Sequence, residues 1–154
     1  MLETTERLHE QATDLLSGII SSIENVIPLQ LDFHAPTSSE QVVKLEYGVL
    51  IGIIGDVKGK MVLVGERAFF GRIGKEMFGM TPEGDMLLSF SGELGNMIAG
   101  GMATKVMEKE IKSDITSPTI LQGDTIMSGF KDGLHIPITV ENAGEMDVYL
   151  LLDL

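Results

Sequence analysis

The sequence has no cysteine, few basic residues and no long hydrophobic run, and each absence excludes a class of protein. Without cysteine, the chain can form no disulfide, no thiolate zinc site and no thiol nucleophile. Its 11 basic and 23 acidic residues give a net charge of −12, so phosphate backbones and anionic lipid surfaces would repel it. The nearest approach to a basic patch is Lys105, Lys109 and Lys112, and Glu108 and Glu110 interrupt it. We therefore expect neither nucleic acid nor a membrane as a partner.

The aliphatic runs are too short to cross a bilayer. A run such as residues 49–54 is far below the ~20 apolar residues that a spanning helix needs. Residues 1–6 contain no basic segment followed by an apolar core, so no secretory signal is indicated. We expect a soluble cytoplasmic protein whose 154 residues form a single domain spanning 1–154.

The hydrophobic pattern changes its period along the chain. Helical spacing predicts a helix over residues 3–25, ended by Pro28, with an apolar stripe of Leu8, Ala12, Leu15, Ile19, Ile23 and Val26. Alternating patterns predict strands over residues 29–33, 43–53, 61–64, 115–121, 134–140 and 146–152. Two further helices are predicted, over residues 66–78 with Gly79 after the last turn, and over residues 81–109 with Thr81 as the cap. This order predicts an α+β fold with a mostly antiparallel sheet covered by helices.

The helix predicted over residues 81–109 contains four glycines. Gly92, Gly95, Gly100 and Gly101 each cost about 1 kcal/mol relative to alanine inside a helix. Such a helix is expected to pack closely against another element of the protein or against a partner. Tight packing on the sheet would account for Gly101 and Gly92 better than for Gly100.

At about 100° per residue, this helix divides into two faces. The expected buried stripe lies within about 40° of Leu94 and consists of Leu87, Phe90, Leu94, Ile98 and Gly101. Well away from it, at about −100° to −160°, lies a column on successive turns: Ser89, Glu93, Asn96 and Gly100. We call these four residues the motif column.

The motif column carries a carboxylate and a carboxamide three residues apart. The Asn96 carboxamide has a donor and an acceptor, so it can hold a water in a fixed direction. Phosphoryl hydrolysis needs mainly such positioning. The Glu93 carboxylate can bind a cation such as a partner's lysine, and Gly100 lets a partner approach closely. A Glu-x-x-Asn pair alone is common on solvated helix faces.

Residues 89–100, read with Ser117 and Pro118, resemble the CheC/CheX/FliY family of bacterial chemotaxis phosphatases. The family pattern is Asp or Ser, Glu four positions on, Asn three further, and a distant Pro. The resemblance extends through the hairpin at residues 55–63 and the C-terminal strands, so it covers most of the chain. A single Glu-x-x-Asn helix favours the CheX branch.

This resemblance implies a single CheX-like domain that hydrolyses the aspartyl phosphate of a CheY-type receiver domain. Asn96 would orient the attacking water, and Glu93 would pair with the receiver's lysine. The protein would need no cofactor of its own, because the Mg²⁺ would be the receiver's. Ser89 matches the first motif position without a chemical role, and Ser89 and Gly100 would contact the partner. A homodimer is also implied.

The sequence is also compatible with other functions. The same fold could bind a receiver or another signalling partner without hydrolysing anything, which would require neither Glu93 nor Asn96. An enzyme acting on small molecules is the weakest alternative, because no nucleophile–base pair is apparent.

Several other patterns carry no site. Residues 55–61 lack the glycine and hydroxyl positions of a phosphate loop, and a hairpin turn accounts for them better. The 10 methionines could provide an adaptable binding surface, but several of them, Met61 and Met146 among them, lie in strand patterns and are expected in the core. No metal-ligand spacing relates the three histidines, which are His9, His34 and His135.

Overall fold

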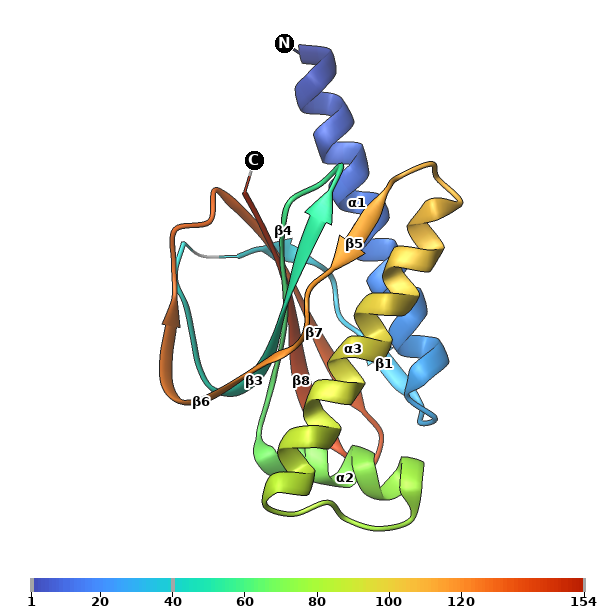
Figure 1. Ribbon diagram of the computed structural model, residues 1–154, viewed down its shortest axis with the longest axis vertical. Coiled ribbons are helices and arrows are strands. Elements are labelled where there is room, and N and C mark those ends of the chain that lie inside the picture. The colour runs from blue at the N-terminus through green and yellow to red at the C-terminus, as the bar shows by residue number, and fades with distance from the viewer. Residues whose placement is uncertain (1, 40, 154) are drawn as a thin grey trace.

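Two long helices pack side by side on one face of an antiparallel sheet, and a shorter helix lies across one end of it (Figure 1). The computed structural model describes residues 2–39 and 41–153. The helices are α1 (Leu2–Val26), α2 (Arg67–Phe78) and α3 (Asp85–Met107). The strands are β1 (Leu31–Phe33), β2 (Thr37–Ser38), β3 (Val43–Gly55), β4 (Gly59–Gly65), β5 (Ser113–Ile115), β6 (Thr119–Met127), β7 (Asp132–Val140) and β8 (Gly144–Leu152).

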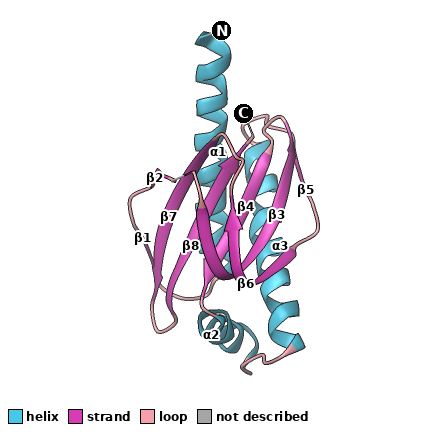
Figure 2. Ribbon diagram, turned by 90° about the vertical axis from the view of Figure 1, so that its left-hand side faces the viewer, coloured by secondary structure: helices cyan, strands magenta, loops and turns pink. Residues whose placement is uncertain are grey.

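The eight strands form one sheet in the order β1-β7-β8-β4-β3-β5, with β2 also pairing with β7 and β6 with β3. Every pair is antiparallel. Figure 2 shows the strands in front of α1 and α3. The predicted α+β class with a helix-covered antiparallel sheet is therefore confirmed.

The main hydrophobic core lies between the sheet and the helices. Ala12, Leu15, Ile19 and Ile23 of α1 are buried, as their spacing predicted. The prediction for the Leu8 side chain lies outside the described part of the structure. The core also takes in the inward side chains of α3 and of the central strands.

Strand β3 contributes to two hydrophobic clusters. Its alternating residues from Val43 to Ile53 are all buried, as predicted. Residues from Tyr47 onward join the main core, whereas Val43 and Leu45 pack with Val62 and Leu151 in a second cluster. The pairing with β6 shifts register between Leu45 and Tyr47, and such a bulge bends and twists the strands.

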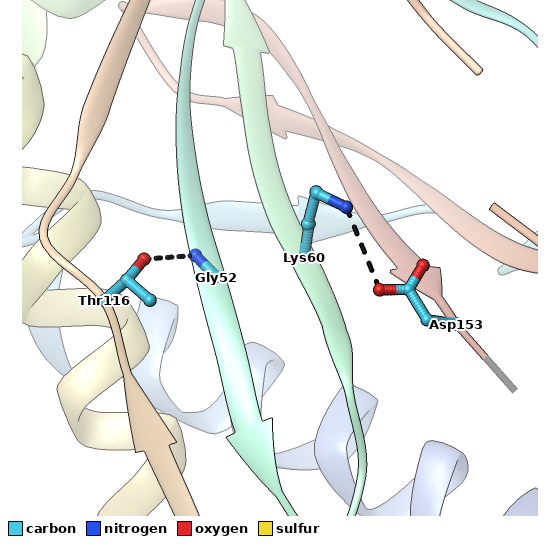
Figure 3. Close-up of polar contacts among 4 residues, drawn as sticks. All are labelled: Gly52, Lys60, Thr116 and Asp153. Carbon is cyan, nitrogen blue, oxygen red and sulfur yellow. Dashed lines mark hydrogen bonds and ion pairs between the residues drawn. The ribbon is translucent and has the colours of Figure 1, made fainter. Parts of the chain in front are cut away.

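The prediction of one strand over residues 115–121 is wrong, because β5 and β6 are separate. Both pair with β3, and the chain between them is held through a side chain. Thr116 Oγ1 accepts a hydrogen bond from the Gly52 amide at 2.8 Å (Figure 3). The Thr116 amide also donates to the Gly52 carbonyl at 3.0 Å. A Cβ at Gly52 would lie 2.9 Å from Thr116 Oγ1, so the strand glycine permits this close approach.

Helix α3 begins at Asp85 and not at Thr81, so the predicted threonine cap is also wrong. The preceding loop folds back onto α2. A Cβ at Gly74 would lie 2.6 Å from Pro82 Cγ and Cδ, and one at Gly71 would lie 3.4 Å from Thr81. This packing holds residues 81 and 82 outside the helix. At the other end α3 stops at Met107, two residues before the predicted end.

Candidate functional site

Two buried hydrogen bonds set the rotation of α3. The Ser91 hydroxyl donates to the Leu87 carbonyl at 2.8 Å, so the Tyr47 hydroxyl of β3 is the donor in its 2.7 Å contact with Ser91 Oγ. From α1, the Ser22 hydroxyl donates to the Ile98 carbonyl at 2.7 Å. Both serines are buried, so breaking either bond would leave a polar group unsatisfied in the core. The helix is therefore fixed against both the sheet and α1.

With α3 held in this way, the predicted stripe faces inward. Leu87, Phe90, Leu94 and Ile98 are all buried. Gly101 is partly exposed, but it lies against α1 at Ser22. The predicted buried face is thus confirmed, with Gly101 at its edge.

The motif column lies on the outer side of α3. Ser89, Glu93 and Asn96 are exposed, and Gly100 is partly exposed. Within the described residues, neither Glu93 nor Asn96 has a hydrogen bond or ion pair to another side chain. Their exposed positions three residues apart place both groups toward solvent on neighbouring turns. Carboxylate and carboxamide are therefore available to one external target.

The four glycines of α3 have different neighbours. A Cβ at Gly95 would lie 2.8 Å from Val49 Cγ1, and one at Gly101 would overlap the Ser22 hydroxyl. A Cβ at Gly92 would make ordinary contact with Pro118, at 3.5 Å. At Gly100 a Cβ would meet nothing within 4 Å. Packing inside the protein therefore accounts for Gly95 and Gly101 but not for Gly100.

The distant proline of the motif lies beside α3. Pro118 packs over Gly92, one turn before Asn96, although 21 residues separate Asn96 from Pro118 in the sequence. Pro118 lies in the segment between β5 and β6, directly before β6 begins. The fold thus brings the segments of the resemblance to one face.

An apolar groove that the sequence did not reveal adjoins the motif column. We call it the Met80–Met86 groove; its volume is about 410 Å³, and its lining residues are Phe78, Met80, Thr81, Pro82, Met86, Ser89, Phe90 and Glu93. Ser89 and Glu93 therefore belong to both the groove and the column. Met61 and Met146 are buried as expected, whereas Met80 and Met86 are exposed. No single segment of the sequence indicates the groove, because α2, α3 and the loop between them all contribute lining residues.

A larger cavity, of about 970 Å³, shares no lining residue with the motif column. It contains Arg67 and Arg72, which are already engaged. Arg67 donates to Gln122 Oε1 at 2.7 Å and lies over the Tyr47 ring, and Arg72 donates to the Ala143 carbonyl at 2.8 Å. Size alone therefore does not identify the site.

The hairpin residues and the histidines, for which the sequence predicts no site, make contacts within the fold. Residues 55–61 span the hairpin of β3 and β4, whose connection is residues 56–58, and there Asp56 Oδ2 accepts a hydrogen bond from the Lys112 amide at 2.9 Å. His34 contacts Thr139 at 2.9 Å, and His135 contacts Asp147 at 2.7 Å. Across the residues described, no three His, Asp or Glu side chains are grouped so as to hold a metal ion. Within the same residues, no helix has the length and apolar character needed to cross a bilayer.

The fold and the outward-facing Glu-x-x-Asn helix define a class of protein. A family model described as "Chemotaxis phosphatase CheX" matches residues 47–144, and the chain belongs to this family.

Individual relatives agree with this assignment. The "CheY-P phosphatase CheX" of Thermotoga maritima is 26% identical over 141 residues, which cover 88% of this chain and 91% of the relative. The fold is similar to a CheC-like superfamily protein from Shewanella sp. PV-4, with a TM-score of 0.76, 21% identity and 90% and 96% of the two chains covered. It is also similar to a chain in the CheX–CheY–BeF₃–Mg²⁺ complex from Borrelia burgdorferi, with a TM-score of 0.72, 17% identity and 91% and 96% covered.

Proposed function

We propose that this protein is a phosphatase for the phosphoaspartate of a CheY-type receiver domain. The observation that carries the proposal is the joint exposure of Glu93 and Asn96 on adjacent turns of an anchored helix. The name of the Thermotoga maritima relative states the same activity, and the Borrelia burgdorferi complex contains a CheX and a CheY.

In this proposal Asn96 aims the water that attacks phosphorus. Its carboxamide oxygen accepts a hydrogen bond from the water, while its NH₂ group donates one to a neighbouring oxygen. The lone pair of the water then points in line with the bond to be broken. The side chain does not titrate, and it therefore contributes position and not proton transfer. An acyl phosphate has a good leaving group, so such positioning supplies the main catalytic need.

Glu93 has a different role in this proposal. Its exposed carboxylate forms a charge-assisted pair with the receiver's active-site lysine. The pair fixes the register of α3 on the receiver and so sets where the Asn96 carboxamide lies. The Mg²⁺ that the resemblance implies belongs to the receiver, and this chain supplies no step through it.

The test of the function is hydrolysis itself. A CheY-type receiver from the same genome is loaded with a small phosphodonor, and the decay of its phosphoaspartate is followed with and without the protein. We expect acceleration at substoichiometric amounts of the protein. If it binds the phosphorylated receiver and leaves the decay rate unchanged, the alternative of a binding module without catalysis is correct.

Gly100 gives a prediction about the approach of the partner. Gly100→Phe should fold normally and raise the KM for the phosphorylated receiver about tenfold or more, because the ring would project into the space where the receiver approaches. KM is measured from initial rates over a range of receiver concentration.

Gly100→Ala is the matched control for this experiment. Since its Cβ meets nothing, it should keep full activity and add up to about 1 kcal/mol of stability through helix propensity. A Gly100→Phe protein with an unchanged KM would show that the receiver does not approach this position.

We also propose that the protein forms a homodimer, as the resemblance implies. Strand β6 pairs with β3 on one side, and its Ile126 side chain is 65% exposed. An exposed edge strand of this kind is a common place for association.

A further inference from the structure

The Met80–Met86 groove adjoins the motif column, and we propose that it receives an apolar side chain of the receiver domain next to the phosphorylated aspartate. This inference rests on the proposed function and adds a docking contact to it. The contact would contribute affinity and partner selection, while Glu93 and Asn96 address the active site.

The groove gathers exposed apolar side chains. Phe78, Met80 and Met86 are 66%, 69% and 64% exposed, and they make up three of the eight large apolar side chains that are exposed in the described part of the chain. Covering apolar surface gains roughly 25 cal/mol per Å². Apolar surface gathered at one place on a soluble protein commonly marks a site of interaction.

The walls of the groove are held by the fold. Pro82 packs closely over Gly74 of α2, and the Phe78 and Phe90 rings meet edge to face at 5.8 Å between centroids. Gly79 and Gly84 end the loop with positive φ angles of 80° and 57°. On this fixed frame, Met80 and Met86 have unbranched side chains that adapt to the shape of a partner.

The position and charge of the groove favour a receiver as its occupant. Ser89 and Glu93 line the groove and also belong to the motif column, so a partner that pairs with Glu93 is in contact with the edge of the groove. Glu93 is the only charged residue among those that line it. A partner that presents a lysine there, with an apolar side chain beside it, matches both features. A second copy of this chain, with its net charge of −12, would bring like charge toward Glu93.

The test separates docking from chemistry. Met86→Glu should raise the KM for the phosphorylated receiver about tenfold or more and leave kcat within about twofold, because the groove does not touch the reacting atoms. The variant Met86→Leu keeps an apolar side chain at this position and should have the same KM as the original protein. The matched control is Met107→Glu, since Met107 lies at the far end of the same helix, is 57% exposed and does not line the groove.

Each remaining outcome has one meaning. If the original protein accelerates hydrolysis and Met86→Glu leaves KM unchanged, the docking inference is overturned and the proposed function stands. An equal rise in KM for Met107→Glu would also overturn it, because the effect would be one of general charge. If the original protein accelerates nothing, the function fails and the inference fails with it. A change in the sedimenting mass of Met86→Glu would assign the groove to self-association instead.

Discussion

Asn96→Ala should remove about 100-fold or more of the rate at which the protein hydrolyses a receiver's phosphoaspartate, while KM changes little. The alanine keeps the helix, since Asn96 is exposed and bonds to no other side chain in the described structure. What is lost is the group that directs the attacking water. The measurement is single-turnover decay of the phosphorylated receiver at saturating protein, which reports the chemical step apart from binding.

Two comparison variants sharpen this experiment. Asn25→Ala replaces another exposed helical asparagine, on α1, and should leave the rate unchanged. Glu93→Gln keeps the shape of the side chain but removes its charge, so it should act mainly on KM, by about tenfold or more. An Asn96→Ala protein that retains the original kcat would remove Asn96 from the mechanism and leave the activity, if present, to be explained by another group.

Gly101→Val should lower the free energy of unfolding by about 3 kcal/mol. A Cβ at Gly101 would overlap the Ser22 hydroxyl and lie 3.1 Å from Ser22 Cβ, and valine adds two methyl groups to the same space. If Ser22 rotates away, its buried hydrogen bond to the Ile98 carbonyl is lost. For a chain of this length the loss corresponds to a decrease in Tm of about 10 °C.

Gly100→Val is the internal control for this stability measurement. It makes the same residue change one position earlier in the same helix, where a Cβ has no neighbour within 4 Å. Helix propensity slightly favours valine over glycine, so its Tm should rise or stay the same. Similar losses in the two variants would mean that the contact with Ser22 does not determine the stability of this part of the helix.

Local pattern was sufficient to predict much of the fold. The buried stripe of α1, the buried face of β3 and the two faces of α3 follow from the period of a helix or strand, which does not depend on distant parts of the chain. The outward position of Glu93 and Asn96 could be predicted for the same reason, as both lie about a quarter-turn or more away from the Leu94 stripe.

Features created by contacts between distant segments could not be predicted in this way. The start of α3 depends on Pro82 packing over Gly74, and a local capping pattern at Thr81 carries no information about that contact. The separation of β5 from β6 depends on the Thr116 side chain bonding to Gly52. The Met80–Met86 groove needs α2, the loop and α3 together, so no single segment indicated it.

The hydrogen bonds made by the Ser22 and Ser91 hydroxyls affect the rate at which this protein can act on a receiver after the two meet. They lock α3 when the chain folds, so its outer surface is preorganised before any encounter. Little conformational entropy of α3 is then lost on association, and the reaction does not wait for a lid to close. We therefore expect phosphoaspartate decay to begin without a lag after mixing, with an initial velocity proportional to the amount of protein added.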